Sequence, residues 1–233
     1  MNKLLKYILI TLMIQGGNSF AASYPSVQAM LEANYSHSKD AKYPWHKDNS
    51  DSAMNNYSVC KEDKIPFNAS DILIVMCSDT ELATSLYEEV PNDIYWIRNT
   101  SNGIEVIGFV KDIGEDYIGI VPVSPTKWAI EITSSSFNQG YLQEHRVLGF
   151  ITNEGFNTIA SWTALMEDHN NDDSMENTLS VEKNKPLVNG FYPVSIVSVT
   201  TKGNKRITKK KYEFFFDEKI NDYNIPEELN GGY

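Results

Sequence analysis

The sequence predicts an α+β fold, in which a small helical, disulfide-tied amino-terminal part is followed by an antiparallel β-sheet or partly open barrel. Three observations carry this prediction: apolar residues at helical spacing before Pro91, alternating apolar residues after it, and two cysteines in the first part. The predicted organisation is a signal peptide over residues 1–21, a helical, disulfide-containing segment over 22–92 and an antiparallel β domain over 93–233. We expect about six to eight strands in that sheet.

The first 21 residues have the pattern of a secretory signal peptide. Lys3 and Lys6 precede the apolar run 7–14, and residues 19–21 (SFA) place small residues at the last and third-last positions before a cut. The apolar run is shorter than the roughly 20 residues that span a bilayer, so we expect cleavage after Ala21 rather than stable membrane insertion. The predicted location is the periplasm or the extracellular space.

The chain is acidic. It has 20 Lys and Arg against 31 Asp and Glu, a net charge of −11, and residues 1–21 hold two of the basic residues and none of the acidic ones. The chain that follows a cut after Ala21 therefore has 18 basic and 31 acidic residues, a net charge of −13. This charge disfavours binding to nucleic acid, which needs clustered Lys and Arg, and favours a cationic partner.

The two cysteines, Cys60 and Cys77, are predicted to form a disulfide, since paired cysteines are typical of an oxidising compartment. The bond closes a loop of 16 intervening residues. On the chain-entropy model a loop of this length contributes about 3 kcal/mol of stability. A cysteine nucleophile is disfavoured because the second cysteine is well placed to oxidise it.

Helices are predicted on both sides of a polar loop over residues 36–56. The first covers Ser26–Tyr35, with Ser26 as N-cap. The second begins after the cap residues 68–71 and breaks near residues 77–79, where Ser78 or Asp79 caps a third helix over Thr80–Glu89.

The residues around the second cysteine carry a resemblance to a known family. The run MCSDTELA over 76–83, with a cysteine upstream after an aromatic residue, resembles the paired-cysteine motif of the secreted lysozyme-inhibitor-like (LprI-type) family. The similarity covers residues 57–87, and the matching positions are Cys60, Cys77, Asp79, Leu82 and Ala83, whereas Ser85 and Leu86 stand where that family has Leu and Asp. The resemblance implies a small helical envelope module that binds lysozyme-like enzymes.

After Pro91 the pattern predicts strands. Residues 94–98 and 104–110 flank Asn102-Gly103 and are predicted to form a hairpin, and with 117–123 and 127–133 they are predicted to form an antiparallel meander. Further strand pairs are predicted at 147–152 with 156–162 and at 192–201 with 206–216. Pro122 predicts an edge position for its strand.

Two acidic or polar segments invite a metal interpretation that their spacing does not support. Asp168, Asn170 and Asp172 alternate as in an EF-hand loop, but Asp173 and Leu179 occupy the positions where that loop needs Gly and Glu. We therefore predict a flexible surface loop over 166–185, and calcium binding by residues 167–182 stays an open alternative. The loop residues His37, Asp40, His46, Asp48 and Asp51 match no ligand spacing, so no metal or cofactor is expected.

The last hairpin concentrates positive charge. Six of the 18 basic residues after residue 21 fall within ten positions: Lys202, Lys205, Arg206, Lys209, Lys210 and Lys211. One interpretation is a site for an anionic surface such as lipopolysaccharide or teichoic acid. The favoured interpretation is an edge strand protected by lysines, because the acidic remainder of the molecule can pair with them.

No catalytic signature is found, so the leading functional prediction is an exported, acidic binding protein of the cell envelope. Its expected partner is a basic cell-wall hydrolase, such as a lysozyme-like enzyme or an amidase, for which the chain is an inhibitor or immunity protein. The predicted partner-binding residues are Asp79, Trp96, Trp128, Lys209, Lys210 and Lys211. Two alternatives remain: a secreted hydrolase with catalytic carboxylates dispersed along the sequence, and a structural component of an envelope complex.

Overall fold

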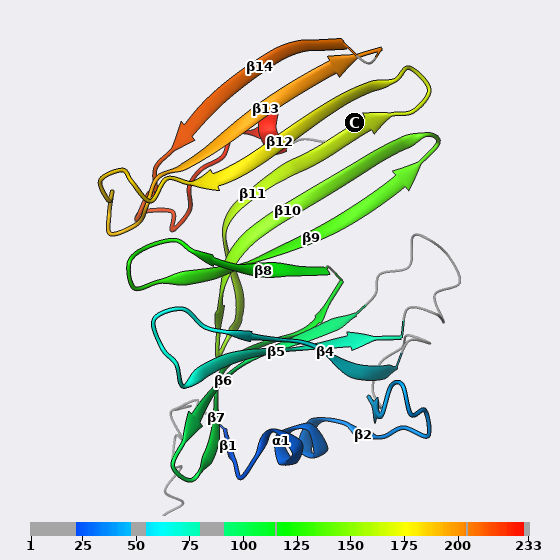
Figure 1. The fold of residues 1–233 in the computed structure, drawn as a ribbon, viewed down its shortest axis with the longest axis vertical. Helices are drawn as coiled ribbons and strands as arrows, with labels where there is room; N and C mark the ends of the chain where they lie inside the picture. The colour runs from blue at the N-terminus through cyan, green and yellow to red at the C-terminus, as the bar shows by residue number, and fades with distance from the viewer. Residues whose placement is uncertain (1–21, 48–54, 80–90, 115, 204, 231–233) are drawn as a thin grey trace, which may run out of the picture.

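The protein consists of two seven-stranded antiparallel sheets stacked end to end along its long axis (Figure 1). The computed structural model describes residues 22–47, 55–79, 91–114, 116–203 and 205–230. The first sheet has the order β1-β7-β6-β5-β4-β3-β2 and the second β14-β13-β12-β11-β10-β9-β8.

The first sheet is built from the amino-terminal half of the chain and the second from the remainder. Its strands are β1 (Ser23–Tyr24), β2 (Ser36–His37), β3 (Trp45–His46), β4 (Asn56–Lys64), β5 (Asp71–Ser78), β6 (Asn92–Thr100) and β7 (Gly103–Ile113). Those of the second sheet are β8 (Asp116–Pro122), β9 (Trp128–Asn138), β10 (Tyr141–Thr152), β11 (Gly155–Asp168), β12 (Asp173–Val181), β13 (Val194–Lys202) and β14 (Lys205–Phe214).

The predicted α+β class with a helical amino-terminal part is wrong, because the described chain is mostly strand. The described helices are α1 (Val27–Asn34) and the single turn α2 (Glu227–Asn230). The first predicted helix is confirmed: Ser26 caps α1 by accepting a hydrogen bond from the Ala29 amide at 3.1 Å, and Met30 and Leu31 are buried. The predicted signal peptide at 1–21 and the predicted helix at Thr80–Glu89 lie outside the described residues.

The segment after residue 71 was predicted as a helix and is the central strand β5. Leu73, Ile74, Val75 and Met76 are all buried, since Ile74 and Met76 pack with α1 while Leu73 and Val75 face the junction with the second sheet. A strand that is buried on both faces has an unbroken apolar run, which resembles a buried helix in sequence. Asp71 begins this strand and does not cap a helix.

The predicted disulfide between Cys60 and Cys77 is confirmed, with a Cα–Cα distance of 5.7 Å. It joins the neighbouring strands β4 and β5, not a helix and a loop. Val59 pairs with Met76 and Lys61 with Val75, so Cys60 is the extra residue of a β-bulge. Within the described residues, no helix is long and apolar enough to cross a bilayer.

The predicted hairpins are present, but they belong to two sheets. β6 pairs with β7 and β8 pairs with β9, while the chain changes sheets between Ile113 and Asp116, so the single four-stranded meander is wrong. The first sheet thus extends through β7, beyond the predicted boundary at 92/93. β8 and β14 are the two edges of the second sheet, which confirms the edge position predicted from Pro122.

The predicted flexible loop over 166–185 is also wrong in most of its length. β11 continues to Asp168 and β12 begins at Asp173, so the acidic residues form a tight hairpin turn. The Asp168 carboxylate accepts hydrogen bonds from the Asn170 amide at 2.9 Å and from Asn171 Nδ2 at 2.6 Å. Among the residues that the structure describes, no group of three or more His, Cys, Asp or Glu is placed to hold a metal ion.

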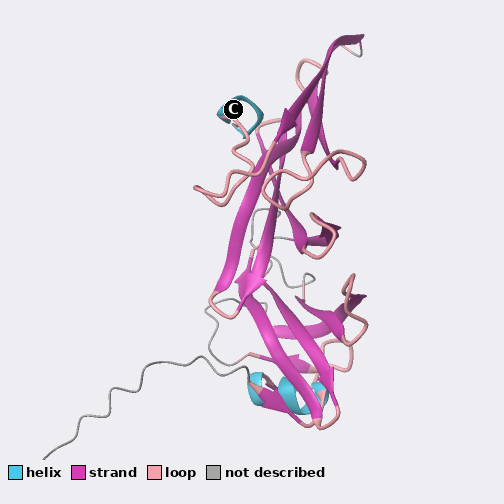
Figure 2. Ribbon diagram, turned by 90° about the vertical axis from the view of Figure 1, so that its left-hand side faces the viewer, coloured by secondary structure: helices cyan, strands magenta, loops and turns pink. Residues whose placement is uncertain are grey.

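Three apolar clusters stabilise the fold. One lies between α1 and the first sheet, one joins the two sheets, and one lies on the second sheet beneath the carboxy-terminal segment. The joining cluster contains Ile94 and Val110 of the first sheet and Ile130 and Ile151 of the second. Gly108 of β7 permits this contact, because a Cβ atom there would lie 2.9 Å from the Thr152 carbonyl oxygen of β10. Because the two sheets are stacked end to end, the molecule is long and narrow in side view (Figure 2).

Candidate binding site

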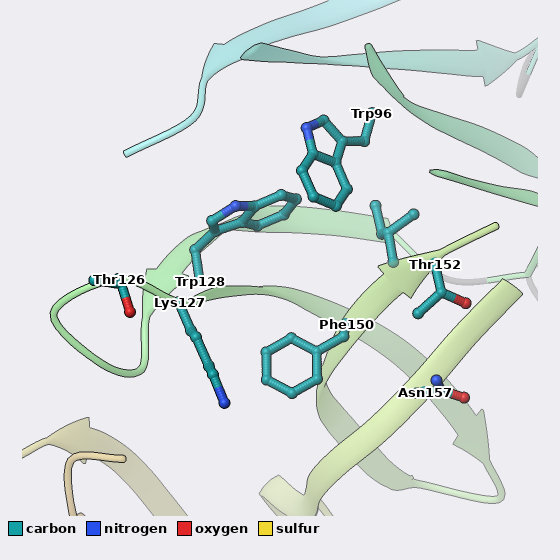
Figure 3. A pocket seen from close by; sticks show the side chains of 8 residues that line it. Trp96, Thr126, Lys127, Trp128, Phe150, Thr152 and Asn157 are labelled. Atoms are coloured by element: carbon teal, nitrogen blue, oxygen red, sulfur yellow. The ribbon is translucent and has the colours of Figure 1, made fainter. Parts of the chain in front are cut away.

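The two sheets meet at an aromatic cleft. Trp96 of β6 and Trp128 of β9 come from different sheets, yet their ring centroids lie 5.0 Å apart with an interplanar angle of 81°. The cleft has a volume of about 360 Å³ and its lining residues are Trp96, Thr126, Lys127, Trp128, Phe150, Ile151, Thr152 and Asn157 (Figure 3). Two predicted partner-binding residues are thus brought together in one concave site.

Trp96 is held in place by a buried carboxylate. Its Nε1 atom donates a hydrogen bond of 3.0 Å to Asp71 Oδ2, and the same carboxylate accepts bonds of 2.7 and 2.9 Å from Nε and Nη2 of Arg98. Asp71 is only 1% exposed, whereas the indole ring of Trp96 is half-buried. The polar atom of the indole is therefore satisfied inside the protein, and its apolar ring faces the cleft.

A tight turn positions the rim next to Trp128. The hydroxyl of buried Ser124 accepts hydrogen bonds from the amides of Thr126 and Lys127, at 3.1 and 2.9 Å. The Lys127 ammonium lies 4.2 Å from the centroid of the Phe191 ring, a cation–π contact that directs the side chain along the rim. The backbone here is thus fixed by its own turn before any partner binds.

The lining of the cleft has the composition of a recognition site. The described residues that line it include neither a carboxylate nor a histidine nor a cysteine. Its side chains are aromatic or aliphatic with Thr, Asn and one Lys at the rim. An apolar surface with a few polar groups at its rim is typical of a recognition site.

The remaining predicted residues lie elsewhere. Asp79 is 5% exposed at the end of β5, where its amide donates to the Asn56 carbonyl at 2.8 Å, and it does not line the cleft. Lys209, Lys210 and Lys211 lie on β14, at the outer edge of the second sheet (Figure 1). The predicted set is therefore not one site: only the two tryptophans meet.

Most residues of the basic cluster on the last hairpin form no ion pair with the described part of the chain. Lys211 forms an ion pair of 2.6 Å with Glu182. Within the described part of the chain, no ion pair is found for the other five, Lys202, Lys205, Arg206, Lys209 and Lys210. The expected pairing of these cations with acidic residues of the same molecule is thus seen at Lys211 only. The predicted edge position of their strand is confirmed, because β14 is the last strand of the second sheet.

A buried polar centre in the first sheet had no signal in the sequence. Asp93 is fully buried and accepts hydrogen bonds from the Tyr35 hydroxyl, from the Asp112 amide at 2.8 Å and from Lys47 Nζ at 3.3 Å. Burial, together with Tyr95 and Asp93, raises the pKa of Tyr35 well above its usual value, so the phenol stays a neutral donor. Three different residues of the first half of the chain thus satisfy this buried carboxylate and tie α1 to the first sheet. The partners Tyr35 and Asp93 are 58 positions apart, so no local motif announces them.

The LprI-type resemblance stays a prediction. Its matched residues Cys60 and Cys77 lie on neighbouring strands, and Leu82 and Ala83 lie outside the described residues. Compared with protein-family models, with curated proteins and with solved structures, the chain gives no match.

Proposed function

We propose that the protein is an exported binding protein that uses the Trp96–Trp128 cleft to anchor a basic protein partner, such as a lysozyme-like cell-wall hydrolase or an amidase. The observation that carries the proposal is the pair of half-buried tryptophans in an apolar cleft. Tryptophan is among the residues most enriched in the energetic centres of protein interfaces, where it fills or forms concave apolar sites.

The rigidity of the cleft supports this proposal. Asp71 and Arg98 hold Trp96, and the Ser124 turn holds the segment before Trp128. Affinity rises when the binding groups are already ordered, because less side-chain entropy is lost on association. The cleft therefore suits a partner that places one apolar side chain against the two rings.

The charge of the chain supports a basic partner. Residues 22–233 have a net charge of −13. A field of this sign attracts a cationic protein and speeds its association, and the effect weakens as salt screens it. We expect the association rate to fall with salt, while the dissociation rate, which depends on the cleft, changes little.

The test is a titration of the secreted protein against purified lysozyme-like enzymes and amidases at low and moderate salt, followed by calorimetry. Trp128→Ala is expected to weaken binding by about 2 kcal/mol, or roughly 30-fold. Phe137→Ala is the matched control, because Phe137 is a 40% exposed aromatic residue on the same strand, outside the cleft. Asn157→Arg blocks the exposed rim without touching the core, so it reports on the cleft even where Trp128→Ala loses stability.

Two results would overturn the proposal. One is that no enzyme of these classes binds at any salt concentration. The other is that Asn157→Arg and Trp128→Ala bind as tightly as Phe137→Ala, which would place the interface elsewhere.

A further inference from the structure

A second pocket opens in the second sheet, where two neighbouring strands separate. β11 and β12 are paired only over Leu165–Asp168 and Asp173–Glu176, whereas β12 pairs with β13 along its whole length. Beyond those four pairs β12 turns away from β11 (Figure 1). Asn177 bridges the start of the separation by donating a hydrogen bond of 2.7 Å from Nδ2 to the Thr163 carbonyl.

The pocket lies at this point and has a volume of about 390 Å³. β9, β10 and β12 contribute charged side chains to it, β11 contributes a tryptophan and two aliphatic residues, and β12 also contributes an amide, a hydroxyl and a leucine. The lining residues are Glu131, Glu144, Arg146, Trp162, Ala164, Leu165, Glu176, Asn177, Thr178 and Leu179.

Two buried polar atoms of this lining have no partner among the described residues. They are Nε1 of Trp162, whose side chain is 1% exposed, and Oδ1 of Asn177, which is 2% exposed. A buried donor or acceptor without a hydrogen bond is rare in proteins and destabilises the fold. One is a donor and the other an acceptor, and a hydroxyl group can serve either of them.

The charged side chains of the pocket give it a negative balance. Arg146 donates from Nε to Glu144 at 2.6 Å and from Nη1 to Glu131 at 2.9 Å. Three glutamates and one arginine line the pocket, so one guanidinium does not neutralise the carboxylates. Arg146 thus holds the side chains of Glu131 and Glu144 near each other.

We propose that this pocket binds an amino sugar: a single pyranose ring with free hydroxyls and one ammonium group. A hydroxyl oxygen accepts from Trp162 Nε1, a hydroxyl hydrogen is donated to Asn177 Oδ1, and the ammonium pairs with the glutamates. Ala164, Leu165 and Leu179 provide the apolar surface for the ring. This site is separate from the Trp96–Trp128 cleft, with which it shares no lining residue.

The test follows the indole N–H resonances of the chain from residue 22 to residue 233 by ¹⁵N–¹H NMR during titration with glucosamine. The signal of Trp162, assigned with Trp162→Phe or by replacing the other three tryptophans with phenylalanine, is expected to shift and saturate. The signals of Trp45, Trp96 and Trp128 are expected to stay in place. Glucose lacks the ammonium and N-acetylglucosamine lacks its charge, so both are expected to bind at least about tenfold more weakly.

Variants give the matched comparison. Glu131→Gln removes one carboxylate of the pocket and is expected to weaken glucosamine binding about tenfold, while Glu154→Gln, in the exposed turn between β10 and β11, is expected to leave it unchanged. The proposal is overturned if the Trp162 signal is unmoved by all three sugars, if glucose binds as tightly as glucosamine, or if the two variants behave alike.

Discussion

Trp96 and Trp162 are two tryptophans in opposite situations. Trp96 exposes part of its ring to a cleft, and its indole N–H is bonded to Asp71. Trp162 buries its ring in the core of the second sheet, and its indole N–H has no partner among the described residues. The first offers a partner an apolar surface, whereas the second offers a ligand a hydrogen bond.

The two residues differ in whether the indole N–H already has a hydrogen-bond acceptor, and this difference suits them to different binding partners. A satisfied polar group leaves only the hydrophobic surface to be covered, which suits a protein interface. An unsatisfied buried group gains most from a ligand that supplies the missing bond, which suits a small polar molecule. The fully bonded Asp93 shows the third case, in which nothing remains for a ligand.

A large loss of stability is expected when Asp71, which holds the indole N–H of Trp96, is replaced. Asp71→Ala removes the acceptor of Trp96 and both bonds from Arg98, and it is expected to lower the free energy of unfolding by about 2–3 kcal/mol. Glu62→Ala, at an exposed position of β4, is the control and should change it by less than about 0.5 kcal/mol. Urea denaturation measures both, and equal losses would show that Asp71 does not hold the cleft.

The disulfide lies in the first sheet, which carries Trp96, and not in the second sheet, which carries Trp162. Replacing Cys60 and Cys77 with serine is expected to cost about 3 kcal/mol, because the unfolded chain regains the freedom of the closed loop. Hydrogen exchange should accelerate in β4 and β5, which the bond joins, and stay unchanged in β13 and β14. Equal acceleration in both sheets would mean that they unfold as one unit.

The edges of the sheets differ as well. The first sheet ends in the two-residue strands β1 and β2, whereas one edge of the second is the ten-residue strand β14. Unpaired lysines on a long edge oppose pairing with another chain, so Lys209→Thr with Lys210→Thr is expected to increase self-association in sedimentation velocity. Lys183→Thr with Lys219→Thr, at two exposed turns, removes the same number of charges and is the control. If the double variant is monomeric at every protein concentration at which the wild type is monomeric, the lysines do not protect the edge.

The smallest expected effect is a change in stability with pH that depends on His145, which lies between the pocket residues Glu144 and Arg146. Burial lowers the pKa of His145 on β10 below its usual value of 6.5. Below pH 6.5 the unfolded chain therefore binds this proton more readily than the folded chain does, so stability falls as the pH drops from 6.5 toward the folded-state pKa. His145→Gln is expected to flatten this part of the stability profile, which urea denaturation at a series of pH values measures. A profile that falls equally in the wild type and in His145→Gln would assign the response to other groups.

The sequence predicts local structure better than it predicts the sites. The cap at Ser26 and the hairpin at Asn102-Gly103 depend on nearby residues, and both are found. The sequence predicts a helix where β5 lies, because burial of both faces of β5 removes the alternation that marks a strand. Likewise, the disulfide joins two neighbouring strands, with Cys60 in a β-bulge. The spacing of two cysteines alone does not show whether their bond joins two strands or a strand and a helix.

The two candidate sites depend on how distant parts of the chain are placed. The cleft requires the contact between the two sheets, and the pocket requires the point at which β11 and β12 separate. Trp96 and Trp128 could each be predicted as an anchor, but their contact requires the chain to change sheets after Ile113. Trp162 and Asn177 could not be predicted, because a missing hydrogen-bond partner is a property of the surroundings and not of the residue. Buried polar atoms are therefore found only once the strands have been placed.

The most direct test of the contrast between the two tryptophans is a titration with a basic cell-wall hydrolase that binds the protein, followed through the indole N–H resonances. The expected result is that the signals of Trp96 and Trp128 shift or broaden strongly while the signal of Trp162 changes no more than that of Trp45. A strong response of Trp162 with no response of Trp96 and Trp128 would contradict the assignment of the protein partner to the cleft between the sheets.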